Sequence, residues 1–548
     1  MTKIVFISDY FIDEILGGAE KCNAALIKQL EKEHTVEQHK SASVTLEFLK
    51  ENSSSFFIIA NFFQLPEELK DFLAKNLDYI IYEHDHKYVS TNNPVRFRGL
   101  LAPTNCLINR DFYESARNVI CQSRFHAKIL YQNLLIPNII NAAANFWDEA
   151  DLEILSDLIN TPKDIKYGAF ETANKNKGMP AAIKYCNDNQ LELTLIPHLQ
   201  YGDFIRTLSR VENLVFFPQW VESYSRVAIE AKILGCKLIT NKLLGVASEP
   251  YFKLNGTELL QQLRKNNATL IKKINKIIVG KPVANNFEMK EIPKITISCS
   301  LYKGEKYIRG FLEDTTRQTI FDKCELIIVN ANSPENEEEI IFEYMEKYKN
   351  IKYHRLDYRA TTTEAVNMVI EELATGEYIT IGNVDDRRRP DCLEVQAKHL
   401  LFSKNVDLVY GDCLQTTSPN ETYFHNTSNG NTYEHSRRDF SPPNMIKCLP
   451  GPMPMWKKSL HKKFGYFSHD FKYANDWDMW LRMVQGGTVF KKIPETLGLY
   501  YFNEEGNSTS PKNFKEKIKE ENKIFLENKE VFGPANYNRY KNYFAQGN

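Results

Sequence analysis

The sequence predicts an α/β protein in which helices cover parallel sheets, and three observations lead to this fold class. Short apolar runs rich in β-branched residues alternate with helical patterns from the first residues onward. The chain has 548 residues, of which 43% are hydrophobic, enough for several packed cores. Its ten cysteines include no C-x-x-C pair and mostly lie in apolar runs, so we expect buried, reduced thiols and no disulfide framework.

The first 280 residues contain two groups of expected strands. The first group comprises KIVFIS, FFIIA and DYIIYEH, with helices expected from about Ala19 to Glu33 and near 67–76. The second comprises strands at 165–170, 191–196, 213–218 and 236–240, followed by a Lys-rich helix at about 257–278. This alternation predicts two Rossmann-like units, at about 1–145 and 146–280.

A linker and a third α/β unit are expected next. Residues 281–292 have the Pro and Asn content of a linker, and the new unit is expected at 293–548. Its first four strands are expected at 294–300, 324–333, 351–356 and 377–386, with a helix between each pair. Crossover helices place the ends of parallel strands on one edge of a sheet, so the polar residues there should meet.

Charge and hydropathy narrow the function classes. The chain has 69 Lys and Arg against 70 Asp and Glu, a formal net charge of −1, so no overall field attracts polyanions and nucleic acid is not expected as a partner. Strand-like residues follow Met1 at once, which leaves no room for a signal peptide, and no apolar run reaches the ~18 residues of a membrane span. We therefore expect a soluble, cytoplasmic protein, with peripheral membrane contact left open.

Carboxylates mark the C-terminal unit at two places. Asp385 and Asp386 directly follow a strand, where carboxylates can hold a divalent cation against a diphosphate. About ninety residues later, Asp476 and Asp478 open an amphipathic helix and offer a base to the same pocket. Each pair alone also fits a surface turn or an acidic helix start, which the helix dipole favours. Their combination in this order favours a site.

These motifs resemble the family 2 glycosyltransferases of the GT-A fold over about 250 residues. The segments that carry the resemblance are SLYKGEKYI, Asn330 to Ser333, AVNMVIEELATGEYI, Asn383 to Asp386 and Asn475 to Asp478. The resemblance implies a nucleotide-diphospho-sugar transferase domain that inverts the anomeric centre. It also implies Asp476 as general base, Asp385 as ligand of Mg²⁺ or Mn²⁺, and donor contacts from Asn330, Ser333, Asn383 and Asp386. Asn stands for the family's Asp at 330, 383 and 475, so we expect weaker metal affinity.

Neighbouring segments carry subsidiary expectations. Trp480 is expected in the core, and Trp477 either there or stacked on a sugar. The Pro/Gly segment 449–456 is expected to floor an acceptor pocket, and the polar segment 415–445 is either a mobile loop over a site or a tolerated insertion. Arg387 to Arg389 are predicted to form a solvated turn, with phosphate contact as the alternative.

Glycines and charged residues form a second pattern in the N-terminal part. Gly17 and Gly18 follow the first strand and open the first helix, where backbone N–H groups can face a phosphate. Lys177 follows the strand that contains Gly168. Seven residues separate Glu222 from Glu230, and Glu222 is expected just before the helix that carries Glu230.

This second pattern resembles the family 4 glycosyltransferases of the GT-B fold over residues 1–280. The resemblance implies that Gly17, Gly18 and Lys177 hold the donor diphosphate, that Glu222 contacts the donor sugar as the catalytic carboxylate, and that Glu230 binds the ribose. The Arg that the family carries after the Gly168 position is missing, and Lys175 is the candidate substitute. The half-domains are also short, which leaves open a degenerate module.

The cluster YEHDH at 82–86 has ligand types that suit zinc but lacks a second cluster, so we expect it to line the cleft between the halves.

Taken together, the motifs predict a two-module glycosyltransferase, retaining-type in its N-terminal module. It would transfer sugars from UDP- or GDP-sugars to a glycan or glycoconjugate. The alternatives are a DNA-base glycosyltransferase and a catalytically degenerate carbohydrate-binding or scaffold protein.

Overall fold

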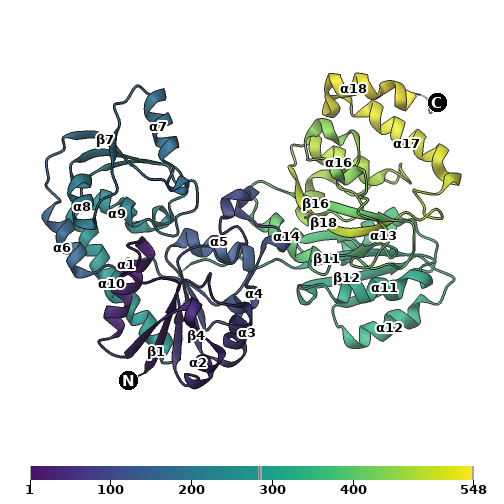
Figure 1. Cartoon of the computed structure of the whole chain (residues 1–548). Coiled ribbons are helices and arrows are strands. Elements are labelled where there is room, and N and C mark those ends of the chain that lie inside the picture. Colours follow the sequence, from purple (N-terminus) through teal and green to yellow (C-terminus); the bar gives the residue numbers. More distant parts are fainter. Residues whose placement is uncertain (1, 282, 284–286, 546–548) are drawn as a thin grey trace. The chain divides into compact units, whose positions relative to one another are not determined.

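The computed structural model describes residues 2–281, 283 and 287–545, which form two compact units (Figure 1). Unit 1 is Met1–Met289 and unit 2 is Lys290–Asn548. Both contain parallel strands flanked by helices, so the predicted α/β class is confirmed. The division falls inside the segment 281–292, of which residues 282 and 284–286 lie outside the described residues.

The first half of unit 1 is built on a six-stranded, wholly parallel sheet of order β2-β1-β3-β4-β5-β6. Its central strands are apolar and buried on both faces, as parallel sheets between helices require. The strands are β1 (Lys3–Ser8), β2 (Thr35–Lys40), β3 (Phe56–Ile59), β4 (Tyr79–Glu83), β5 (Asn118–Cys121) and β6 (Ile139–Asn141). The helices are α1 (Gly18–Leu30), α2 (Leu46–Glu51), α3 (Glu67–Asn76), α4 (Arg110–Ser115) and α5 (Arg124–Leu134).

The second half of unit 1 has a four-stranded parallel sheet of order β10-β9-β7-β8. Its strands are β7 (Ile165–Phe170), β8 (Thr194–Ile196), β9 (Val211–Phe216) and β10 (Lys237–Thr240). Its helices are α6 (Glu149–Asp157), α7 (Met179–Asp188), α8 (Tyr201–Ser209), α9 (Arg226–Ile233) and α10 (Gly256–Ile278). Helix α10 joins the halves, because Leu259 and Leu263 pack into the second core while Leu270 and Ile274 pack into the first.

Unit 2 contains an eight-stranded sheet of order β13-β12-β11-β14-β17-β16-β18-β15. The first four in that order are parallel, and antiparallel pairs bring in β17 and β15. The strands are β11 (Ile295–Leu301), β12 (Cys324–Asn330), β13 (Ile351–Arg355), β14 (Tyr378–Ile381), β15 (Arg387–Arg388), β16 (Leu408–Thr416), β17 (Met455–Lys457) and β18 (Phe490–Tyr501). The helices are α11 (Glu305–Thr316), α12 (Glu337–Lys347), α13 (Thr362–Met368), α14 (Cys392–Phe402), α15 (His461–Phe464), α16 (Asn475–Gln485), α17 (Phe514–Glu527) and α18 (Lys529–Ala545).

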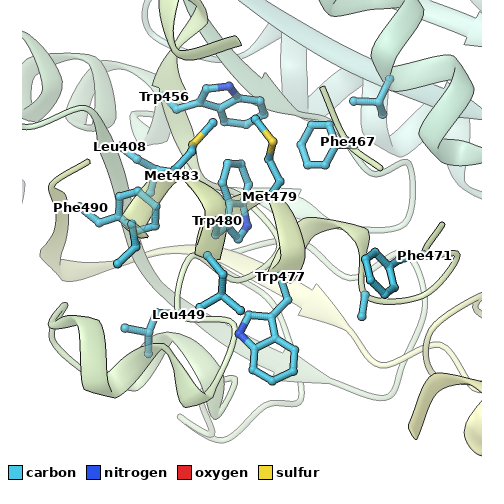
Figure 2. Packing of buried hydrophobic residues seen from close by; sticks show 14 of the residues in the cluster. Leu408, Leu449, Trp456, Phe467, Phe471, Trp477, Met479, Trp480, Met483 and Phe490 are labelled. Atoms are coloured by element: carbon cyan, nitrogen blue, oxygen red, sulfur yellow. The ribbon is translucent and has the colours of Figure 1, made fainter. Parts of the chain in front are cut away.

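An aromatic core holds α16 in place (Figure 2). Trp480 is buried against Trp456, with ring centroids 5.1 Å apart, so its predicted core position is confirmed. Trp477 is also buried, and its indole N–H donates to the carbonyl of Met445 at 2.7 Å. Truncating a buried Trp costs ~3–5 kcal/mol, so this packing fixes the helix start that carries Asp476.

The prediction that Arg387 to Arg389 form a solvated turn is wrong. Arg387 and Arg388 are buried and form β15, which pairs with β18. The Arg387 guanidinium donates to the carbonyls of Val384 (2.9 Å) and Asp386 (2.7 Å), and Arg389 pairs with Glu495 (2.6 Å). The Arg387 guanidinium therefore stabilises the turn that carries Asp385 and Asp386.

All ten cysteines carry free thiols, and eight of them are buried. Within residues 2–281, 283 and 287–545, no helix combines the length and the apolar character that crossing a membrane requires.

Candidate active sites

Two adjacent carboxylates follow β14 in unit 2, of which Asp386 is buried and Asp385 is partly buried. Asp386 accepts hydrogen bonds from the Asn383 amide (2.9 Å) and from the backbone N–H of Tyr501 (3.1 Å). Asp385 accepts from the Asn503 amide at 3.3 Å. Burial raises the pKa of both groups, and the charge of Asp385 raises the pKa of Asp386 further. A cation beside the pair would offset this repulsion.

The carboxylate pair fits a hard divalent cation. Among the described residues, no group of three or more His, Cys, Asp and Glu side chains gathers to hold a metal by protein ligands alone. Mg²⁺ commonly binds proteins through one or two carboxylates and takes its other ligands from phosphates and water. Asp385 with Asp386 supplies such a partial set.

Asn330 and Ser333 shape the turn after β12. The Asn330 side-chain oxygen accepts from the backbone N–H of Ser333 at 2.7 Å, and the Ser333 hydroxyl donates to Glu337 at 2.7 Å. Both residues are buried. Their side chains stabilise the strand end, and their contact with a donor stays a prediction.

Asp476 and Asn383 line one cavity of about 350 Å³ in unit 2. Asp476 accepts from the N–H of Trp477 (2.8 Å) and from the thiol of Cys448 (3.4 Å). Burial is the largest influence on Asp476 and raises its pKa, while both hydrogen bonds lower it. The N-cap residue of α16 is Ala474, so Asp476 does not occupy the N-cap position.

Tyr500 links the cavity to the carboxylate pair. It lines the cavity, and burial raises the pKa of its hydroxyl, with further increases from the charges of Asp386, Asp385 and Asp476. The predicted metal ligand and the predicted base therefore lie around one tyrosine.

Two irregular segments contribute to the cavity wall. Tyr433 and His435, from the polar segment 415–445, line it, as do Gly451 and Pro452 from the Pro/Gly segment expected to floor a pocket. Asn420, in the same polar segment, accepts from Arg387 at 3.0 Å. The polar segment 415–445 thus contributes to the cavity wall and also to the hydrogen bonds of Arg387, which stabilises the turn of Asp385 and Asp386.

Unit 1 contains a second cavity, of about 490 Å³. All five residues predicted for this unit line it, namely Gly17, Gly18, Lys177, Glu222 and Glu230. Lys177 pairs with Glu222 at 2.9 Å. Glu230 is buried on α9, accepts from the Tyr201 hydroxyl at 3.0 Å, and has a pKa raised by burial. Glu222 precedes α9, as expected.

Two details of unit 1 qualify the phosphate assignment. A Cβ placed on Gly17 would clash with a carboxylate oxygen of Glu20, so this side chain folds over the start of α1. A phosphate bound there requires Glu20 to move. Lys175, the candidate substitute for the missing Arg, is exposed and does not line the cavity.

Three further residues of this region were missed by the sequence analysis. Asp151 pairs with Lys21 at 3.0 Å and with Arg226 at 3.2 Å, and Arg226 lies 3.7 Å above the Trp147 ring centroid. Lys21 and Arg226 line the cavity. Lys21 lies one helical turn after the glycine pair, and this position in the sequence could have indicated that it belongs to the site. The sequence around Asp151 contains no such indication.

The cluster at 82–86 contributes to the same cavity. His84 and Asp85 line it, as expected for a cleft position, and a ring nitrogen of His84 lies 2.6 Å from the side-chain oxygen of Asn23. Burial lowers the pKa of His84 well below its usual value. The zinc alternative gains no support, because among the described residues no group of three or more His, Cys, Asp and Glu side chains could hold a metal ion.

Comparison with known proteins finds a family match within unit 2. Residues 297–465 match the family model described as Glycosyl transferase family 2. The uncharacterized glycosyltransferase MJ1057 of Methanocaldococcus jannaschii is 27% identical over 222 residues, 38% of this chain and 70% of that protein. The uncharacterized glycosyltransferase YwdF of Bacillus subtilis is 26% identical over 223 residues, 40% and 77% of the two chains. The crystal structure of S. aureus TarS 1–349 with UDP is 17% identical, with TM-score 0.34, over 42% of this chain and 65% of that one.

The family match and the curated relatives define a transferase enzyme of the glycosyltransferase class. More particularly, unit 2 carries a glycosyltransferase family 2 domain.

Proposed function

We propose that the protein transfers a sugar from a UDP- or GDP-sugar to a carbohydrate or glycoconjugate acceptor. In this proposal unit 2 is a GT-A module that is metal-dependent and inverting, and unit 1 is a GT-B module of the retaining type. One observation carries the proposal: Asp476 lines a cavity with Asn383 and Tyr500, beside the carboxylate pair Asp385 and Asp386.

In unit 2, Asp476 takes the proton from the acceptor hydroxyl. The freed oxygen attacks the anomeric carbon as the bond to the diphosphate breaks. A carboxylate whose pKa is raised by burial is a better proton acceptor than an exposed one. Asp385 and Asp386 would hold Mg²⁺ or Mn²⁺, which when bound offsets charge on the nucleoside diphosphate. Asn383 orients Asp386 through its amide.

In unit 1, the proposal assigns the diphosphate to Gly17, Gly18 and Lys177. Glu222 contacts the transferred sugar and Glu230 the ribose. Support comes from the shared cavity and from the burial of Glu230, whose carboxylate faces a hydroxyl partner in Tyr201.

A carbohydrate-binding protein without catalysis is the second candidate, favoured by Asn at 330, 383 and 475. A DNA-base glycosyltransferase has less support, because the net charge of −1 provides no general attraction for DNA.

A donor screen that measures nucleoside diphosphate release, with and without Mn²⁺, tests the proposal. We expect release with at least one UDP- or GDP-sugar, loss of the Mn²⁺-dependent part in Asp385→Ala, and no change in the control Asp470→Ala, which alters an exposed residue. Mn²⁺-dependent release that survives Asp385→Ala would contradict the metal assignment. Donor binding without any release would favour the carbohydrate-binding candidate.

A further inference from the structure

Helix α17 lies beyond the segment that matches the family model, yet one of its faces lines the cavity of Asp476. Phe514, Lys517, Ile518 and Glu521 all contribute to the cavity wall. Their spacing of three, four and seven residues places them on one side of a helix. The cavity wall facing the base therefore comes partly from the C-terminal part of unit 2.

A carboxylate on α17 fixes this helix to the start of α16. Glu520 accepts hydrogen bonds from three consecutive backbone N–H groups, those of Lys472 (2.9 Å), Tyr473 (2.7 Å) and Ala474 (3.1 Å). Ala474 is the N-cap residue of α16, two positions before Asp476. Further along α17, Ile524 and Phe525 pack into the core that contains Trp480. These contacts therefore fix the position of the cavity-lining face of α17 relative to Asp476.

The lining chemistry of the cavity is that of a sugar site. Aromatic side chains supply apolar surface, those of Tyr433, Tyr473, Trp477, Tyr500 and Phe514. Phe514 is 62% exposed, which core packing does not explain. A sugar ring presents C–H faces to aromatic rings and hydroxyls to polar groups, and small-molecule sites combine such surfaces in volumes of about 300–1,000 Å³.

The polar groups on the same face match sugar hydroxyls. The Lys517 ammonium lies 3.9 Å from the Glu521 carboxylate, and both side chains line the cavity. One group donates hydrogen bonds and the other accepts them. A sugar ring placed against Phe514 would have the Lys517 donor and the Glu521 acceptor on the same wall of the cavity.

We propose that this face of α17 is the acceptor-sugar subsite of unit 2. Phe514 stacks on a sugar ring, while Lys517 and Glu521 bind its hydroxyls and present one hydroxyl to Asp476. The inference rests on the proposed function and specifies the acceptor as a sugar, in contrast to a protein side chain or a lipid alcohol.

Saturation-transfer NMR on the full chain tests this subsite with methyl glycosides of glucose, galactose, mannose and N-acetylglucosamine as probes. We expect at least one glycoside to bind wild type, and its affinity to fall at least five-fold in Phe514→Ala and in Glu521→Gln. Glu516→Gln is the matched control, because Glu516 lies on α17, is exposed and pairs with Lys519. Phe514 is largely exposed, so its truncation should not unfold the unit, which circular dichroism checks.

The inference is overturned if none of the four glycosides binds wild type, or if binding is unchanged in Phe514→Ala and Glu521→Gln, since such binding would lie elsewhere, for example in unit 1. The release of nucleoside diphosphate from a donor is measured separately. Nucleoside diphosphate release without glycoside binding at α17 would reject the subsite but not the proposed transferase activity. Glycoside binding without release would reject the transferase activity but not the subsite.

Discussion

At the scale of single residues, the state of Asp476 depends on opposing influences. Burial raises its pKa, while the N–H of Trp477, the thiol of Cys448 and the charge of Lys517 lower it. The other ionisable groups that share its cavity are Tyr433, His435, Lys447, Tyr473, Tyr500 and Glu521. The pH range of catalysis should therefore respond to changes at the hydrogen-bonding partner.

Cys448 variants should shift the acid side of the pH–rate profile. Cys448→Ala removes this hydrogen-bond donor, so the pKa of Asp476 rises. As the pH falls, the variant should therefore lose activity at a higher pH than wild type does. A hydrogen bond of about 0.5–1.5 kcal/mol corresponds to a shift of up to ~1 pH unit. Cys448→Ser keeps a donor and should stay near wild type. Initial rates between pH 5 and 9 provide the measurement, and identical acid limbs in all three proteins would show that the thiol does not act on the base.

Glu222 and Glu230 should affect different parts of the unit 1 donor. Glu230→Ala should weaken nucleoside diphosphate binding by about 1–3 kcal/mol, since a hydroxyl of the ribose loses a charged partner. Glu222→Ala frees Lys177 from its 2.9 Å pair, so diphosphate affinity should hold or increase while transfer falls. Calorimetry with UDP and GDP, in a chain that carries Asp385→Ala and without divalent cation, isolates this site. Equal affinities in wild type and Glu230→Ala would refute the ribose assignment.

At the scale of elements, His461 at the start of α15 is a buried neutral group. One ring nitrogen accepts from the Trp456 indole at 2.9 Å, and the other donates to the carbonyl of Gly465 at 2.8 Å. Burial lowers the pKa of His461 to about 4. Protonation would remove the acceptor that Trp456 uses, so the packing of β17 against α15 requires the neutral ring.

Stability of unit 2 should therefore fall in mild acid. The folded-state pKa lies below the usual 6.5, so the unfolded chain binds the proton first, and stability present above pH 6.5 is lost as the pH falls towards 4. The difference of about 2.5 pH units corresponds to about 3 kcal/mol. Thermal unfolding at pH 7 and pH 5 should show a smaller acid loss in His461→Gln than in wild type. The variant of exposed His469, His469→Gln, should behave as wild type, and an equal acid loss in all three would rule out His461 as the cause.

The sequence pattern predicted apolar elements well and polar ones poorly. The runs that became β1, β3, β11 and β12 were recognisable, because buried parallel strands are continuously apolar. Strand β2, TVEQHK, lies at a sheet edge and is partly exposed, so its polar composition hid it. Arg387 and Arg388 looked like a solvated turn, because their partners on β18 are more than a hundred residues away.

The same distinction applies to the candidate sites. Asp385, Asp386 and Asp476 stand in short motifs, so the sequence pointed to them directly. Lys21, Asp151 and Arg226 come together only through the folding of unit 1, and the cavity face of α17 becomes meaningful only beside α16. Local patterns predict motifs, whereas contacts between distant segments require the fold.

At the scale of the whole molecule, the two units have separate cores. One aromatic core lies in unit 2, whereas α10 contributes to a core in each half of unit 1. The halves of unit 1 should therefore unfold together, because removing α10 exposes apolar surface of both.

A chain that starts at Met289 should fold by itself. We expect it to be soluble, to unfold cooperatively and to retain the Mn²⁺-dependent release of the full chain. Limited proteolysis of the full chain should cut within 281–292, and a fragment that ends at residue 145 should not fold, because it lacks α10. An insoluble fragment from Met289, or proteolysis that never cuts in that segment, would contradict the independence of the units.

The central claim, that Asp476 is the base of unit 2, is tested most directly by Asp476→Asn. Turnover of the full chain is measured at saturating donor and acceptor, together with donor affinity. Proton removal acts only in the chemical step, so we predict unchanged donor affinity and turnover lower by ~10² to 10⁴. The amide can still accept from the N–H of Trp477, so the start of α16 should stay intact. Wild-type turnover in Asp476→Asn, under conditions where chemistry limits the rate, would contradict the claim.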